Sequence, residues 1–162
     1  MTVSNVATNP EARTLVITAE FAASLADVWQ LWADPRLLER WWGPPGFPAT
    51  FEFDDLRPGS TITYSMTDPE GGDRFDGTWT VIDVDAPTRL VLADAIVDDD
   101  GTPSDGNSIT RMEIDLEAVG DMTRMTLTTH FDSLDAMEQA IAMGVAEGMK
   151  ACLSQIDALL VE

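Results

Sequence analysis

Apolar and polar residues alternate along the stretch 14–21, near the start of the chain. The apolar positions on one side of this stretch are Leu15, Ile17, Ala19 and Phe21. A repeat of two residues is typical of a β-strand with one buried face. The pattern therefore predicts a first strand here, and we expect residues 1–13, which lack it, to form a flexible N-terminal arm.

Two short helices are predicted directly after this strand. Residues 24–27 have the spacing of a helix-capping box, and an apolar stripe continues from there to about Ala33. Asp34-Pro35 then supplies a second cap and a proline at the first helical position, and this helix extends to Trp42. The Gly-Pro-Pro-Gly sequence at 43–46 ends the helical region, because proline cannot continue a helix and glycine disfavours one.

The repeat of two residues returns at Ala49 and continues to Phe131. It predicts further strands at 49–53, 61–67, 75–81, 89–97, 111–117 and 124–131. Turn-forming sequences such as 68–72 and 120–121 separate these strands. Short strands joined by turns form an antiparallel meander with one polar and one apolar face, so we expect a curved sheet of six or seven strands.

The last stretch, from Ser133 to Val161, has the apolar spacing of one long amphipathic helix. Its apolar positions are Met137, Ile141, Val145, Met149, Cys152, Leu153, Ile156, Leu159 and Leu160. At ~1.5 Å per residue, such a helix would be roughly 40 Å long. The chain is therefore predicted to be a single α+β domain, residues 1–162, in which the sheet wraps around this helix.

Gly144 and Gly148 interrupt the apolar stripe of the predicted helix, and each costs about 1 kcal/mol relative to alanine. Two interpretations remain open. Either a strand or loop packs closely against the bare backbone, or the missing side chains enlarge an internal cavity between the helix and the sheet. The second interpretation would give the chain a binding site.

The chain carries 9 Lys and Arg against 29 Asp and Glu, a formal net charge of −20. A field of this sign repels nucleic acids and anionic membranes, so we expect neither as a partner. Many aspartates with a single lysine, Lys150, suit a high-salt cytoplasm and equally a GC-rich genome. The first residues resemble no secretory signal and no apolar run is long enough to span a bilayer, so we expect a cytoplasmic protein.

Several short motifs occur in a characteristic order along the chain. They are Asp34-Pro35 with Trp41-Trp42-Gly43-Pro44, Asp55-Leu56-Arg57-Pro58-Gly59, Asp68-Pro69-Glu70-Gly71 with Gly77-Thr78-Trp79, Pro87-Thr88-Arg89-Leu90, Thr123-Arg124-Met125-Thr126-Leu127, and Gly144 with Gly148-Met149. Together, from about Thr14 to Leu160, they resemble the homologues of the activator of heat-shock-protein-90 ATPase, within the START-like superfamily. The chain departs from that pattern at Ser60, where glycine is frequent, and at Met149, where tryptophan is common.

The resemblance implies a helix-grip fold with an internal cavity between the sheet and the C-terminal helix. Across the superfamily this cavity holds apolar or amphipathic small molecules, and some branches use it for catalysis. The eukaryotic activators have a second domain, which contributes a main chaperone contact and has no counterpart in these 162 residues. We therefore expect a small hydrophobic ligand rather than a chaperone partner.

Strand parity decides which polar side chains face the interior and could take part in chemistry. His130, the only histidine, is out of phase with the apolar positions of its strand and is expected to face solvent. Asp94 is in phase with Leu92 and would be an inward carboxylate, whereas Tyr64 lies between two inward apolar residues and its hydroxyl needs a partner. Tyr64 and Asp94 are therefore the two candidates for catalysis.

Further residues are predicted to line the cavity. Together with Tyr64 they are Trp41, Trp42, Met66, Phe75, Trp79, Met112, Met125, Thr129, Gly144, Gly148 and Met149. The adjacent tryptophans either close one end of the core or form a lid at the cavity mouth, and the methionines are either core filler or an adaptable lining. Cys152, the only cysteine, is predicted to be a small buried hydrophobe.

The sequence predicts no metal or cofactor site. Asp98 to Asn107 superficially resembles a calcium loop, but its ligand order is wrong and no glutamate closes it. The sequence thus predicts a monomer or homodimer that binds a small apolar or amphipathic molecule in the cavity. Two alternatives remain open: a cyclase- or hydrolase-like enzyme using the same cavity, and a chaperone-related protein-interaction module using the outer sheet face.

Overall fold

The computed structural model describes residues 3–42, 49–52, 56–67, 74–97, 110–142 and 144–160. The strands are β1 (Val3–Asn9), β2 (Thr14–Phe21), β3 (Ala49–Glu52), β4 (Thr61–Thr67), β5 (Arg74–Asp85), β6 (Arg89–Val97), β7 (Thr110–Val119) and β8 (Met122–His130). The helices are α1 (Leu25–Ala33), α2 (Pro35–Trp41), α3 (Leu134–Ala142), α4 (Val145–Ser154) and α5 (Ile156–Leu160). The strands form one antiparallel sheet in the order β1-β2-β8-β7-β6-β5-β4-β3.

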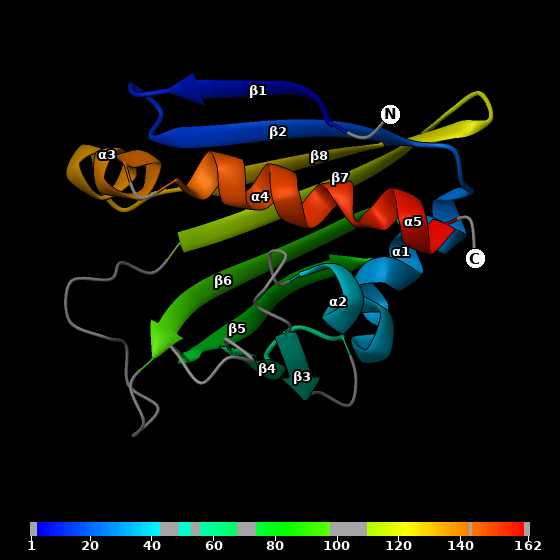
Figure 1. The fold of residues 1–162 in the computed structure, drawn as a ribbon, viewed down its shortest axis with the longest axis horizontal. Helices are drawn as coiled ribbons and strands as arrows, with labels where there is room; N and C mark the ends of the chain where they lie inside the picture. Colours follow the sequence, from blue (N-terminus) through cyan, green and yellow to red (C-terminus); the bar gives the residue numbers. More distant parts are fainter. Residues whose placement is uncertain are drawn as a thin grey trace.

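The C-terminal helices lie on one face of this sheet. Figure 1 shows α3, α4 and α5 following one another across β8 and β7, while α1 and α2 lie together at one end. The sheet curves toward these helices, so that its edge strand β1 comes close to α4. This is the helix-grip arrangement, and the predicted α+β fold class is confirmed.

The prediction of a flexible N-terminal arm is wrong for most of these residues. Val3–Asn9 form strand β1, which pairs with β2 from Val3↔Ala19 to Asn9↔Thr14 and raises the number of strands to eight. The strand has no alternating apolar pattern because residues 5–9, at the sheet edge, are exposed. Backbone hydrogen bonds to β2 hold it in place, and hydrophobic periodicity does not report these.

The prediction of a single long C-terminal helix is also wrong. The chain is helical from Leu134, but Gly144 has a φ of 90°, in the left-handed region, and separates α3 from α4. Glycine adopts this conformation without steric cost, so Gly144 ends one helix and begins the next. The apolar spacing continues through the break because the helices follow one another along the same sheet face (Figure 1).

The predicted helix caps are confirmed. The Ser24 hydroxyl accepts a hydrogen bond from the backbone nitrogen of Asp27 at 3.1 Å, and the Asp34 carboxylate accepts one from that of Arg36 at 2.9 Å. Each cap satisfies a backbone donor at a helix start that has no partner within the helix. These local signals place α1 and α2 between β2 and β3.

Six rings, the aromatic cluster, fill the interior near α1 and α2. Its members are Trp32, Trp41, Trp42, Phe51, Tyr64 and Trp79. Ring centroids lie 4.8 Å apart for Trp32 and Trp41, and also for Trp42 and Trp79, in edge-to-face geometry. The indole N–H of Trp32 donates to the sulfur of Met125 at 3.3 Å. This end of the interior is therefore filled by the chain's own side chains.

Candidate functional site

Tyr64 on β4 and Asp94 on β6 meet across the intervening strand β5. The Tyr64 hydroxyl donates a hydrogen bond to Oδ1 of Asp94 at 2.9 Å. Gly77 on β5 stands opposite Tyr64, and a Cβ atom there would lie 2.1 Å from Cζ of the ring and 2.4 Å from its hydroxyl oxygen. The ring therefore crosses β5 over the bare backbone of Gly77, and only glycine leaves room for it.

The Tyr64 hydroxyl is held in its neutral form. Burial raises the pKa of Tyr64 well above its ordinary value, and the negative charge of Asp94 and the hydrogen bond to it act in the same direction. The nearby Trp79 indole acts oppositely and more weakly, and its buried Nε1 lacks a hydrogen-bond partner in the described part of the chain. Tyr64 thus serves as a hydrogen-bond donor rather than as a base.

Several residues face the interior yet are only partly buried. They are Met66, Asp94, Thr110, Thr129, Gly144, Gly148 and Met149, and together with the buried Tyr64 they form the candidate lining of a ligand site, to which we give the name interior groove. Met66 and Met149 pack against the core, whereas Asp94 and its cross-strand neighbour Thr110 remain partly accessible. Partly accessible inward residues of this kind are the candidates for lining a ligand site.

No neighbouring residue in the described part of the chain packs against the two glycines at the start of α4. A Cβ atom placed at Gly144 or at Gly148 would have no heavy atom within 4 Å apart from the helix's own backbone. The interpretation in which a strand or loop packs closely against them is therefore wrong. The missing side chains leave a gap in the apolar stripe of α4, and the cavity interpretation stays a prediction.

Other predicted lining residues lie in the core. Trp41 and Trp42 are 0% and 6% exposed and belong to the aromatic cluster, which agrees with their closing one end of the core. Met112 and Met125 are also buried. The side chain of Phe75 and the segment 98–109 lie outside the described residues. Thr110 was not predicted as a lining residue. The alternation along β7 could have identified it, because Thr110 lies in step with the inward residues of that strand.

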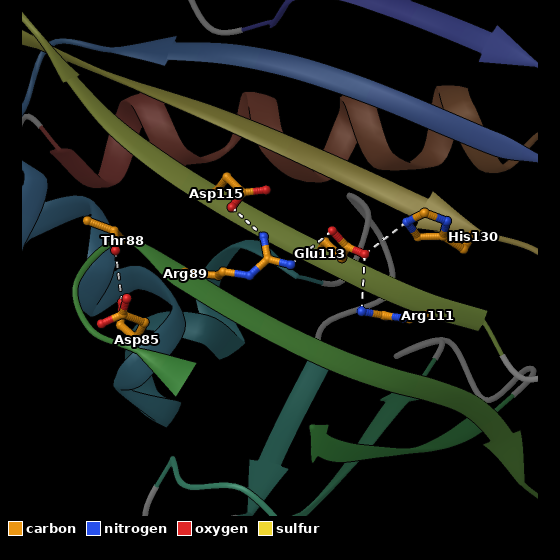
Figure 2. Close-up of polar contacts among 7 residues, drawn as sticks. All are labelled: Asp85, Thr88, Arg89, Arg111, Glu113, Asp115 and His130. Atoms are coloured by element: carbon orange, nitrogen blue, oxygen red, sulfur yellow. Dashed lines mark hydrogen bonds and ion pairs between the residues drawn. The ribbon is translucent and has the colours of Figure 1, made fainter. Parts of the chain in front are cut away.

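A second polar group, the outer ionic cluster, lies on the opposite sheet face (Figure 2). Arg89 contacts Asp115 at 2.7 Å and Glu113 at 3.1 Å, and Glu113 also contacts Arg111 at 3.3 Å and His130 at 3.1 Å. Desolvation acts to raise the pKa of Glu113, but the Arg89 hydrogen bond and the charges of His130 and Arg111 outweigh it, so the pKa is lowered.

His130, the only histidine, belongs to the outer ionic cluster. Its side chain is 38% exposed, so it faces away from the interior groove, as strand parity predicted. Within the described ranges, no group of His, Cys, Asp and Glu side chains could hold a metal ion. No helix within those ranges is long and apolar enough to cross a membrane.

Cys152 is buried on α4, where its thiol donates to the backbone carbonyl of Trp42, and burial raises its pKa to about 12. Above a pH of about 9 the unfolded chain releases a thiol proton that the folded chain retains, so the free energy of unfolding should fall. We expect a slope of up to about 1.4 kcal/mol per pH unit between about pH 9 and 10. Urea titrations at several pH values measure this slope.

The control for this prediction is Cys152→Ala, which should flatten the slope between about pH 9 and 10, because Tyr64 adds its own slope only above about pH 10, where an unfolded tyrosine ionises. The native thiol should also resist aromatic disulfide reagents at pH 8. Rapid labelling of the folded protein would contradict the assignment of Cys152 as an inert core residue.

A curved antiparallel sheet that grips C-terminal helices defines a protein of the START-like class. The chain belongs to the family of Activator of Hsp90 ATPase homolog 1-like proteins, whose model matches residues 22–161. This confirms the resemblance seen in the sequence. No curated protein matches the chain.

Solved structures support the same assignment. Protein Ms6760 from Mycobacterium smegmatis is 40% identical, with a TM-score of 0.89, over 98% of this chain and 96% of that chain. A protein from Arthrobacter aurescens is 41% identical, with a TM-score of 0.93, over 99% of this chain and 92% of that chain. The AHSA1 protein from Silicibacter pomeroyi, 23% identical over 91% of this chain and 97% of that chain with a TM-score of 0.75, shares the fold.

Proposed function

We propose that this protein binds a small apolar or amphipathic molecule in the interior groove. The observation that carries the proposal is the gap at Gly148, where no heavy atom apart from the helix's own backbone lies within 4 Å of the point that a Cβ atom would occupy. Family membership supports it, because the helix-grip fold is one that accommodates ligands. The aromatic cluster fills the other end of the interior, so the ligand would lie near the junction of α3 and α4.

The lining suits a ligand with a large apolar part and a small polar part. Met66 and Met149 supply flexible thioether side chains, which adapt to irregular apolar shapes. Asp94, Thr110 and Thr129 supply polar atoms on the inner sheet face. Ligand pockets generally combine such an apolar lining with a few placed polar groups that fix the orientation.

Filling the gap should block binding. We expect Gly148→Leu to weaken uptake of the neutral fluorescent probe N-phenyl-1-naphthylamine by about tenfold or more, because the new side chain occupies the groove. Probe titration followed by fluorescence measures the dissociation constant. Gly144 is not suitable for this test, because its φ of 90° makes any side chain strained.

The matched control is Gly148→Ala. Its methyl group meets no other atom, so probe binding should persist while the helix gains about 1 kcal/mol of stability. Equal probe affinity for Gly148→Leu and the unchanged protein would contradict the proposed site.

One observation favours a second candidate function, catalysis in the same groove. The Tyr64 and Asp94 pair places a proton donor and a carboxylate 2.9 Å apart on the inner sheet face. A cyclase- or hydrolase-like activity would use Asp94 to accept a proton, since Tyr64 stays neutral. Hydrolysis of p-nitrophenyl esters that is lost in Asp94→Asn would favour this candidate, and equal rates in both proteins would argue against it.

A further inference from the structure

We propose that the free edge of strand β1 docks a second copy of this chain, so that two sheets join through an antiparallel pair of β1 strands. The proposal concerns the edge of the sheet and is independent of the interior groove. It follows from the difference between the two sheet edges, from the absence of charge along β1, and from the symmetry of the sequence at residues 5–9.

The edge formed by β3 is closed to further strands. Arg36 on α2 donates a hydrogen bond to the backbone carbonyl of Phe51 at 2.9 Å, and the Glu39 carboxylate accepts one from the backbone nitrogen of Phe51 at 2.8 Å. Arg36 and Glu39 also contact each other at 3.1 Å. Two charged side chains thus occupy the backbone groups that another strand would need, and charge at an edge is a common protection against pairing.

The opposite edge, formed by β1, has no such protection in the described part of the chain. Residues 5–9 are exposed, and no described side chain bonds to the backbone of residues 5–8. The strand contains no proline, and its one irregularity of pairing, between Val3 and Asn5, precedes this stretch. An edge strand of this kind presents unpaired N–H and C=O groups to which another strand can bond.

The charge distribution favours a second copy as the partner. The chain carries a net charge of −20, yet β1 has no charged residue and its neighbour β2 has one, Glu20. A basic peptide would be recognised by acidic side chains along the strand, and β1 supplies none. Two β1 strands, in contrast, meet along a stretch without like charges, which are destabilising when they lie opposite each other.

The sequence of β1 is suited to pairing with itself. A two-fold axis normal to the sheet makes the two strands antiparallel and keeps the inner faces of both copies on the same side. With Ala7, the middle of the regular stretch, on this axis, Val6 lies opposite Thr8 and Asn5 lies opposite Asn9. Amide side chains both donate and accept, so each pair of asparagines can form a hydrogen bond.

The surface beside β1 leaves room for the partner. An open depression adjoins the end of the strand and is lined by residues of β1, of the turn that follows and of β2, among them Asn9, Glu11 and Val16. In the pairing centred on Ala7, Asn5 of the partner subunit lies opposite Asn9, at the rim of this depression. The depression therefore accommodates side chains at the end of the shared strand pair.

Sedimentation velocity tests the proposal with the unmodified chain, from about 10 μM to about 1 mM. We expect a weak dimer within this range, because a single strand pair gives a small interface. We also expect the dissociation constant to fall about threefold or more between about 0.05 M and about 0.5 M salt, since salt screens the repulsion between two acidic copies. A monomer throughout, or a dimer that salt weakens, would overturn the inference.

Three variants locate the interface. Ala7→Glu places two carboxylates opposite each other across the axis and should raise the dissociation constant about tenfold or more, whereas the neutral Ala7→Ser should dimerise as before. Thr63→Glu adds the same charge at an exposed position on β4 and is the matched control. A dimer that resists Ala7→Glu, or that Thr63→Glu weakens equally, would show that the contact lies elsewhere. Thermal melting shows that each variant is folded.

Hydrogen exchange followed by NMR identifies the backbone groups that pair. Backbone amides of residues 5–9 that point away from β2 should exchange more slowly at about 1 mM than at about 50 μM protein, and this difference should vanish in Ala7→Glu. The amide of Phe51, which Glu39 already engages, should show no such dependence. Protection that leaves residues 5–9 unchanged while the chain dimerises would contradict the assignment to β1.

Discussion

Replacing Gly77 with alanine is expected to destabilise the protein by about 1–3 kcal/mol, because the new methyl group overlaps a side chain that has nowhere else to go. The Cβ atom would lie 2.1 Å from Cζ of Tyr64, well inside any contact distance. Tyr64 is 4% exposed and stacks on Phe51, so its ring cannot swing into solvent without losing core contacts. Urea denaturation measures the loss of stability.

A double-mutant cycle isolates the cause. In the Tyr64→Ala background the ring is absent, so Gly77→Ala should cost little, and the coupling energy between the two positions should account for most of the single-mutant loss. Additive effects of the two substitutions would show that Gly77 is required for some reason other than the crossing ring.

Truncation of Trp32 to alanine is expected to have the larger effect, about 3–5 kcal/mol, because it removes a large buried ring from a packed region. Trp32 is 1% exposed and lies 4.8 Å from Trp41 and 6.2 Å from both Trp42 and Trp79, measured between ring centroids. Its indole N–H also donates to Met125. Chemical denaturation monitored by circular dichroism measures the change.

Gln30→Ala on the exposed side of the same helix is the matched control and should change stability by no more than about 0.5 kcal/mol. A loss below about 1 kcal/mol for Trp32→Ala would mean that the aromatic cluster collapses into the space, and that this end of the interior is softer than its ring contacts indicate.

The sequence predicts the elements that bury a face, and it misses those that do not. Alternation along Leu15, Ile17, Ala19 and Phe21 identified β2, because its inner side chains are at most 1% exposed. Strand β1 buries little and is held by backbone hydrogen bonds, so its side chains give no periodic signal. The helix break at Gly144 was missed because apolar spacing looks the same in one helix and in successive helices on one face.

The candidate site shows the same limit. Strand parity predicts that Tyr64 and Asp94 both face inward, since each side chain's direction depends only on its own strand. Their hydrogen bond depends on the register of three strands and on Gly77 between them, which one sequence does not reveal. The open space at Gly148 likewise depends on packing, so the sequence did not reveal that close packing against this glycine, one of the two interpretations, is wrong.

The crossing of Tyr64 over Gly77 also sets a rule for how related sequences diverge. A tyrosine at position 64 clashes with any side chain at position 77, so we expect the two positions to covary among related sequences. Lineages that keep the tyrosine must keep glycine opposite it, whereas lineages with a small residue at 64 are free to vary at 77. Replacement of Gly77 therefore has to follow the replacement of Tyr64, whereas Tyr64 can change while Gly77 stays.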